Sequence, residues 1–185
     1  MKSIAVYCGL SEKIPGKYLE TANKMGHVLA QRGIRVVYGA GNTGMMGAVA
    51  KGALEAGGEV IGVVPEIFNS PEMILSTISR LEVLPDIHAR IARMMDLSEG
   101  FIALPGGFGT MDEFFQTVTW AQIGLHKKPI GLLNHAGYYD HLASFMRHMQ
   151  AEGFVYSESK SLYLVEDTPE AMLDAIIAYS TSQES

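Results

Sequence analysis

Short apolar runs alternate with longer amphipathic stretches along the chain. The runs are nearly continuous in apolar residues, which is typical of strands buried on both faces of a sheet. They cover residues 3–8, 36–38, 60–64, 81–84, 101–104, 130–133 and 162–165. Between them, apolar residues recur near helical spacing, as Leu19, Ala22 and Met25 do. The helices predicted in this way cover residues 17–32, a segment ending near residue 56, and residues 87–97, 114–123, 138–152 and 169–179.

Strands separated by helices predict an α/β fold, a Rossmann-like doubly wound parallel sheet with helices on both faces. Residues 1–180 are expected to form a single domain, because the length suits one domain and no linker or repeat interrupts the pattern. Residues 181–185 are expected to be a flexible tail. Ligands of such sheets bind at the carboxyl ends of the strands. Two glycine-rich turns, residues 39–47 and 106–109, follow predicted strands there.

The second glycine-rich turn is the strongest candidate for chemistry. Its glycines stand between a strand and a helix, where the backbone can approach a ligand closely. Free N–H groups at a helix start attract anions, most often phosphate. Glu113 follows about one turn later, so that an acid would lie beside a bound phosphate. Thr110 to Glu113 is equally a capping box, in which Glu113 bonds back to the Thr110 N–H, and the residues alone leave both interpretations open.

Residues 105–113, with the sequence PGGFGTMDE, match the P-G-G-x-G-T-x-x-E signature of the Lonely Guy (LOG) family. The resemblance extends over nearly the whole chain and includes residues 37–47 (VYGAGNTGMMG), 119–122 (TWAQ) and 128–134 (KPIGLLN). Members of this family are cytokinin riboside 5′-monophosphate phosphoribohydrolases, long misnamed lysine decarboxylases. The resemblance implies hydrolysis of a purine or N6-modified adenine nucleoside 5′-monophosphate to free base and ribose 5-phosphate, without metal or cofactor.

The resemblance also implies which residues form the site. Arg90 falls on the family's catalytic arginine and Glu113 on its catalytic glutamate, and a fixed carboxylate suits the positive charge that builds on the ribose. Glu72 matches a glutamate that contacts the substrate. By residue type alone, Arg90 and Glu72 fit ordinary surface positions equally well. The remaining candidates for substrate binding are Gly106, Gly107, Phe108, Gly109, Thr110, Met111, Asp112, Thr119, Gly41, Gly44 and Met45.

The chain departs from the family pattern at three positions. Ile91 stands where the family usually has lysine, Gln116 replaces a second glutamate, and Ala40 replaces a glycine. The missing lysine is expected to lower the affinity for monophosphates, so that Ile91→Lys would tighten AMP binding. The added methyl group of Ala40 is expected to change the backbone approach or to narrow the pocket.

Composition and charge exclude several classes of function. The net charge of −6 provides no basic field for nucleic acid, and no apolar run reaches the ~18 residues of a membrane span. Cys8 is the only cysteine and the N-terminus has no signal-peptide pattern, so a cytoplasmic protein is expected. The six histidines show no metal-ligand spacing, and motifs for a serine hydrolase or a pyridoxal phosphate enzyme are missing.

Two other classes of function compete with hydrolysis as interpretations of the sequence. A nucleotide-binding module with little or no catalysis would keep the phosphate loop. A dehydrogenase is disfavoured because the turn at Gly9 lacks G-x-G-x-x-G. The resemblance further implies a homodimer whose active site borrows residues from the partner, for which the apolar side chains of Met94, Met95, Leu97 and Trp120 offer weak support. The nucleoside monophosphate is the only small-molecule partner expected.

Overall fold

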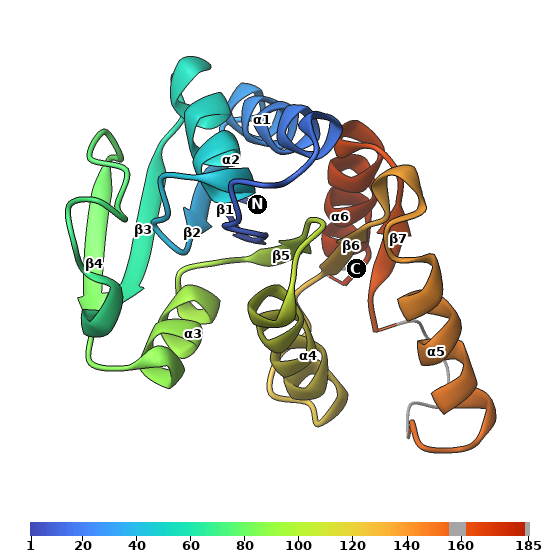
Figure 1. Cartoon of the computed structure of the whole chain (residues 1–185). Helices are drawn as coiled ribbons and strands as arrows, with labels where there is room; N and C mark the ends of the chain where they lie inside the picture. Colours follow the sequence, from blue (N-terminus) through green and yellow to red (C-terminus); the bar gives the residue numbers. More distant parts are fainter. Residues whose placement is uncertain (156–161, 184–185) are drawn as a thin grey trace.

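A computed structural model describes residues 1–155 and 162–183. These residues form a seven-stranded parallel sheet in the order β4-β3-β2-β1-β5-β6-β7, with helices on both faces (Figure 1). The strands are β1 (Ser3–Tyr7), β2 (Arg35–Tyr38), β3 (Val60–Pro65), β4 (Arg80–Leu84), β5 (Gly100–Ala103), β6 (Ile130–Leu133) and β7 (Leu164–Glu166). The predicted α/β, doubly wound fold is therefore confirmed.

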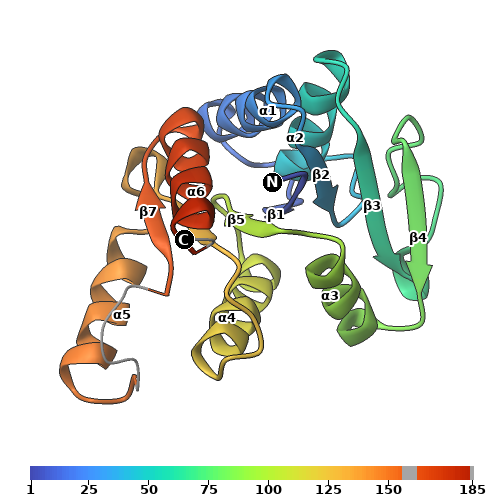
Figure 2. The ribbon, with the colours of Figure 1, turned by 180° about the vertical axis from the view of Figure 1, so that it is seen from behind.

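The helices divide into two layers that cover opposite faces of the sheet. One layer consists of α1 (Gly16–Gln31), α2 (Gly44–Glu55) and α6 (Pro169–Gln183), and the other of α3 (Ile87–Asp96), α4 (Phe108–Gln122) and α5 (Asp140–Ala151) (Figure 2). Each layer buries its own apolar cluster against the strands, which explains why the strands are apolar on both faces. None of the helices in the two described ranges is long and apolar enough to cross a membrane.

The order of the strands creates a crevice beside β1. From β1 the chain builds β2, β3 and β4 on one side, and then it returns to build β5, β6 and β7 on the other. β1 and β5 pair in parallel, with Tyr7 opposite Ala103, so their carboxyl ends lie next to each other. The loops that leave these two ends go in opposite directions, and this divergence is where doubly wound sheets bind ligands.

Two predicted boundaries differ from the structure by more than two residues. α4 begins at Phe108, six residues before the predicted start, because Gly107 adopts an extended conformation and serves as its N-cap. Thr110 therefore lies inside the helix, and the capping-box interpretation is wrong, since no side chain caps α4. α6 continues to Gln183, so the first three residues of the predicted tail are helical, while residues 184–185 lie outside the described part of the chain.

Candidate active site

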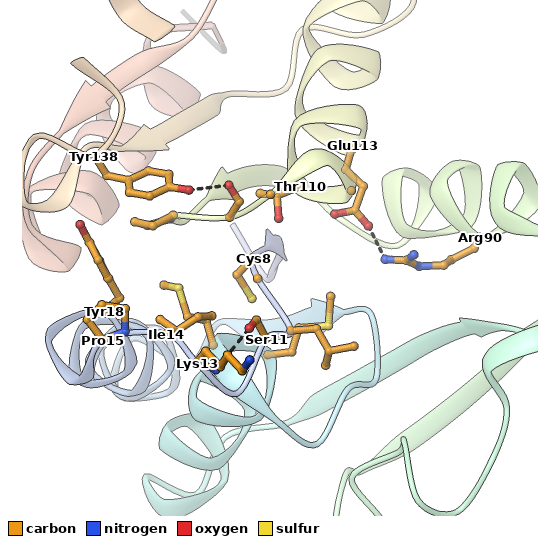
Figure 3. Close-up of a pocket in the computed structure, with 18 residues that line it drawn as sticks. Cys8, Ser11, Lys13, Ile14, Pro15, Tyr18, Arg90, Thr110, Glu113 and Tyr138 are labelled. Carbon is orange, nitrogen blue, oxygen red and sulfur yellow. Dashed lines mark hydrogen bonds and ion pairs between the residues drawn. The ribbon is translucent and has the colours of Figure 1, made fainter. Parts of the chain in front are cut away.

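A cavity of about 510 Å³ opens at the carboxyl ends of β1 and β5, in the crevice that the strand order predicts (Figure 3). Five parts of the chain contribute to its wall: the loop after β1 with Tyr18 of α1, the start of α2, Arg90 of α3, the loop between β5 and α4 with the first two turns of α4, and Tyr138 before α5. The lining residues are Cys8, Gly9, Leu10, Ser11, Lys13, Ile14, Pro15, Tyr18, Met45, Met46, Arg90, Pro105, Gly106, Gly107, Gly109, Thr110, Glu113 and Tyr138.

The glycine-rich turn forms one side of the cavity. Gly106 is required there because a Cβ atom at this position would lie 2.1 Å from the Thr110 hydroxyl oxygen. The first hydrogen bond of the helix runs from the Met111 amide to the Gly107 carbonyl, at 3.0 Å. Within the described residues, the amides of the first helical turn have no acceptor in the protein. Free N–H groups at the positive end of a helix dipole can bind an anion such as a phosphate.

Arg90 and Glu113 form an ion pair at one end of the cavity, while Tyr18 and Tyr138 stand at the other (Figure 3). Arg90 and Glu113 are both buried, at 8% and 3% exposure. Arg90 Nη2 donates to Glu113 Oε1, whereas Arg90 Nε is buried without a hydrogen-bond partner among the described residues. An unpaired buried donor is costly, so a polar ligand atom that accepts from Nε would stabilise this arrangement.

The cap of α3 fixes the position of Arg90. Asp86 is the N-cap, and its side chain accepts hydrogen bonds of 2.8 Å from the amides of His88 and Ala89. This cap places Arg90 in the first turn of α3, as the sequence predicted. A cation at this end opposes the helix dipole, and its pairing with Glu113 offsets that cost.

The pKa of Glu113 is raised to about 7. Burial is the largest cause, since it disfavours the charged carboxylate; Arg90 opposes this rise and Asp112 adds to it. A carboxyl group with this pKa exists in both protonation states near neutral pH. It can therefore accept or donate a proton in a reaction.

The turn after β2 reaches the site from the other side of Arg90. A Cβ atom on Gly39 would lie 2.8 Å from Arg90 Nη2, so only glycine leaves room for the guanidinium as it stands. Ala40 has a φ of 66°, a conformation that costs a non-glycine residue roughly 1–2 kcal/mol. Ala40 and Gly41 line a second cavity of about 160 Å³, which shares Arg90 with the first. Met45 lines the main cavity.

The structure brings together only part of the predicted binding set. Gly106, Gly107, Gly109 and Thr110 line the main cavity together with the Arg90–Glu113 pair. Met45 also lines the main cavity, and Gly41 lines the second one. The remaining candidates lie outside both cavities. Gly44 faces a groove between α1 and α2, Phe108 is 97% exposed, Met111 packs against the apolar core, and Asp112 accepts a hydrogen bond from Gln116 on the outer face of α4. Glu72 and Thr119 are exposed.

Position 91 lines neither of these two cavities. Ile91 is 1% exposed and packs in the apolar cluster between α3 and the sheet. The expectation that a lysine is missing from the binding surface here is therefore wrong, because a lysine at this position would enter the core. Nor is Arg93 a free substitute, since it donates to Glu82 at 2.6 Å and 3.2 Å.

Sequence reasoning missed the loop after β1. This loop supplies Ser11, Lys13 and Ile14 to the cavity, and among the described residues Lys13 is the only lining cation other than Arg90. Tyr18 and Tyr138 were missed as well. Gly9 directly after an apolar strand was an available signal, but it was tested only against the dinucleotide-binding pattern. Gly9 indicates a binding site only when the strand order is known, because that order places the end of β1 beside the end of β5.

Metal ligands are not gathered at this site. Within residues 1–155 and 162–183, no group of three histidine, cysteine, aspartate or glutamate side chains is placed to hold a metal ion. The groups that the cavity offers for chemistry are the helix N–H groups, the guanidinium of Arg90 and the carboxyl of Glu113.

Known proteins share both the sequence and the fold. A family model described as "Possible lysine decarboxylase" matches residues 46–176. A cytokinin riboside 5′-monophosphate phosphoribohydrolase from Rhodococcoides fascians is 42% identical over 176 residues, which cover 95% of this chain and 89% of that protein. One from Arabidopsis thaliana is 38% identical over 182 residues, covering 98% and 85%.

Among solved structures, the molybdenum cofactor carrier protein from Chlamydomonas reinhardtii is 25% identical and aligns with a TM-score of 0.73 over 97% of this chain and 98% of that one. This similarity shows a common fold. The family model and the relatives above 30% identity also show the family, because they span most of the chain. The chain belongs to the LOG family, the family of the cytokinin riboside 5′-monophosphate phosphoribohydrolases.

Proposed function

We propose that this protein hydrolyses the N-glycosidic bond of a purine or N6-modified adenine nucleoside 5′-monophosphate, giving free base and ribose 5-phosphate. The observation that carries the proposal is the buried Arg90–Glu113 pair in the wall of a cavity whose neighbouring wall is the N-terminus of α4. The helix N–H groups suit the phosphate, and the carboxyl group suits the reacting sugar. Relatives that carry the phosphoribohydrolase name support it.

The reaction divides between these groups in a simple way. The 5′-phosphate binds at the Gly106–Thr110 turn and fixes the ribose with C1′ toward Glu113. As the bond between C1′ and the base nitrogen breaks, the base leaves with the electron pair and positive charge develops on the ribose, where the Glu113 carboxylate stabilises it. Water forms the new bond to C1′ and gives one proton to Glu113, while the base takes a proton from solvent.

The raised pKa of Glu113 fits this role. A base with a pKa near 7 is partly ionised at neutral pH, so it can take up a proton and release it again in each turnover. Arg90 holds the carboxyl in place through its ion pair and presents Nε to the ligand.

A homodimer would explain the predicted binding residues that one chain leaves outside its cavities. We infer that a second copy packs near the cavity and that Glu72, Phe108, Met111, Asp112 and Thr119 bind substrate at this shared site. The 97% exposure of Phe108, directly beside the cavity-lining Gly107, supports an occupant at this rim. A cytoplasmic location is part of the same proposal, supported by the unpaired and buried Cys8.

The test is Glu113→Gln, assayed with AMP and with isopentenyladenosine monophosphate. Turnover should fall by at least about 100-fold with little change in nucleotide affinity, because glutamine keeps the shape but cannot carry the charge. Glu152→Gln, an exposed site at the end of α5, is the matched control and should keep full turnover. Equal turnover in wild type and Glu113→Gln would remove the carboxyl from the mechanism.

The alternative is a nucleotide-binding module with little or no catalysis. The molybdenum cofactor carrier protein from Chlamydomonas reinhardtii has the same fold. Binding alone does not need a carboxyl group buried beside the ligand with a pKa near 7, because such a group costs stability. Tight AMP binding without release of adenine by the wild-type protein would favour the module.

A further inference from the structure

Two consecutive tyrosines hold the phosphate turn through hydrogen bonds to its carbonyl groups. Tyr139 donates a hydrogen bond of 2.7 Å from its hydroxyl to the Leu104 carbonyl, and Tyr138 donates one of 2.8 Å to the Gly106 carbonyl. Figure 3 shows the Tyr138 bond beside Thr110. Both acceptors belong to the turn that joins β5 to α4, whereas both donors come from the segment between β6 and α5.

The two carbonyls between and after these positions are bonded as well. The Gly9 amide donates to the Pro105 carbonyl at 3.4 Å, and the Met111 amide donates to the Gly107 carbonyl at 3.0 Å. All four carbonyl groups of residues 104–107 therefore accept a hydrogen bond from within the protein. Because a peptide unit is planar, a fixed carbonyl also fixes the direction of the N–H group that follows it.

The tyrosines are themselves held in place. The Asn134 side chain accepts a 2.6 Å hydrogen bond from the Tyr139 amide and donates one of 2.7 Å to Asp140, which closes the turn between β6 and α5. Ala136 and Gly137 in this turn have positive φ angles, of 54° and 71°. Tyr139 is 3% exposed, and burial raises its hydroxyl pKa, so it remains a hydrogen-bond donor.

We propose that Tyr138 and Tyr139 are positioning residues for phosphate recognition: the Tyr138 hydroxyl orients the peptide plane between Gly106 and Gly107 so that the Gly107 N–H group points at the 5′-phosphate. Tyr139 anchors the start of the turn at the Leu104 carbonyl, whose peptide plane leads into Pro105 and therefore carries no N–H group of its own. The inference deepens the proposed function and rests on it. Glycines give the turn its close approach but also leave it free to take other conformations. The two hydroxyl groups remove this freedom before the ligand arrives, which lowers the ordering cost of binding.

The experiment separates phosphate recognition from general binding. Tyr138→Phe and Tyr139→Phe keep the ring and remove only the hydroxyl. Calorimetric titrations with AMP, inorganic phosphate and adenosine are made in the Glu113→Gln background, so that turnover does not interfere. Each variant should bind AMP and inorganic phosphate about 2- to 12-fold more weakly, the range of one lost hydrogen bond, with adenosine affinity unchanged.

Tyr179→Phe on α6 is the matched control and should leave all three affinities unchanged. Since Tyr138 is 43% exposed, its variant will keep the fold even if Tyr139→Phe weakens it. An equal loss for AMP and adenosine, or no loss at either position, would overturn the inference. If the wild-type protein binds AMP without releasing adenine, the proposed hydrolysis is refuted, but the affinities of the tyrosine variants can still be compared. If the wild-type protein binds neither AMP nor phosphate, both the proposed hydrolysis and the proposed role of the tyrosines are overturned.

Discussion

At the scale of single residues, the protonation of Glu113 links the site to stability. Its pKa in the folded protein is about 7, above the ordinary 4.5. A raised carboxyl pKa contributes stability that is fully present below about 4.5 and is lost as pH rises through about 7. We therefore expect the free energy of unfolding of the wild type, minus that of Glu113→Gln, to fall between pH 5 and 8, by no more than about 1.4 kcal/mol per pH unit.

Chemical denaturation of the ligand-free proteins across this range measures the difference. Subtracting the variant cancels the other titrating groups, since glutamine has no proton to lose there. A difference that stays level across this range would show that Arg90 dominates and that Glu113 stays ionised, because neither the folded nor the unfolded chain would then release a proton there. Such a result would leave its role as an electrostatic stabiliser and remove its role in proton transfer.

A second residue-scale prediction concerns Ile91→Lys. The side chain at this position is buried among apolar groups, so a lysine must leave a charge unpaired in the core or displace α3. We expect a loss of about 2–4 kcal/mol in the free energy of unfolding and no gain in AMP affinity. Ile91→Met, which conserves volume, is the control and should cost less than about 1.5 kcal/mol. Tighter AMP binding by a stable Ile91→Lys protein would contradict this.

Glu113 and Ile91 show what a sequence motif can and cannot predict. The family resemblance, carried by the signature around Gly106, led to Arg90 and Glu113, a pair that the fold does bring into contact. The orientation of Ile91 could not be read in the same way. Adjacent helical positions point about 100° apart. Which of them faces the ligand depends on how α3 is rotated against β3, and that is a tertiary contact.

At the scale of elements, the turn after β2 acts on the site through Arg90. Gly39→Ala places a methyl group about 2.8 Å from Nη2, which must move away from Glu113. We expect turnover to fall by roughly 10- to 100-fold, as a displacement of about 1 Å can produce, without added backbone strain because the φ of Gly39 is not positive. Gly16→Ala, whose new methyl would meet nothing closer than 3.9 Å, is the control. Full turnover in Gly39→Ala would show that the position of Nη2 is not critical.

The start of α4 was the element boundary that mattered most, and the sequence placed it too late. Gly109 lies inside the first turn, where glycine is a poor helix former, and Thr110 with Glu113 imitates a cap. The helix nevertheless begins at Phe108, because the bonded carbonyls of residues 104–107 hold Gly107 as its N-cap. Local helix propensity contains no information about hydrogen bonds from residues more than thirty positions away along the chain, such as those that Tyr138 and Tyr139 donate.

At the scale of the whole molecule, the alternation of strands and helices was enough to predict the fold, but not the strand order. The order decides that the loops after β1 and β5 meet, and so it decides that Lys13 and Tyr18 share a cavity with Gly106. It also decides which apolar side chains remain outside. Met94 and Met95, which we considered as interface residues, are core residues at 0% and 3% exposure.

The exposed apolar groups of α4 and the residues after it lead to the last prediction. Ile123 and Leu125 are 64% and 66% exposed, an unusual position for large aliphatic side chains unless a partner covers them. We expect light scattering at micromolar concentration to give about 40 kDa, twice the 20.1 kDa of the chain. Leu125→Glu should shift the mass toward the monomer. Turnover should fall with it, because the proposed site borrows residues from the partner. Ile67→Glu, in the short 3-10 helix that follows β3 and 80% exposed, tests whether any exposed charge has the same effect. A wild-type mass of about 20 kDa with full turnover would show that one chain completes the site.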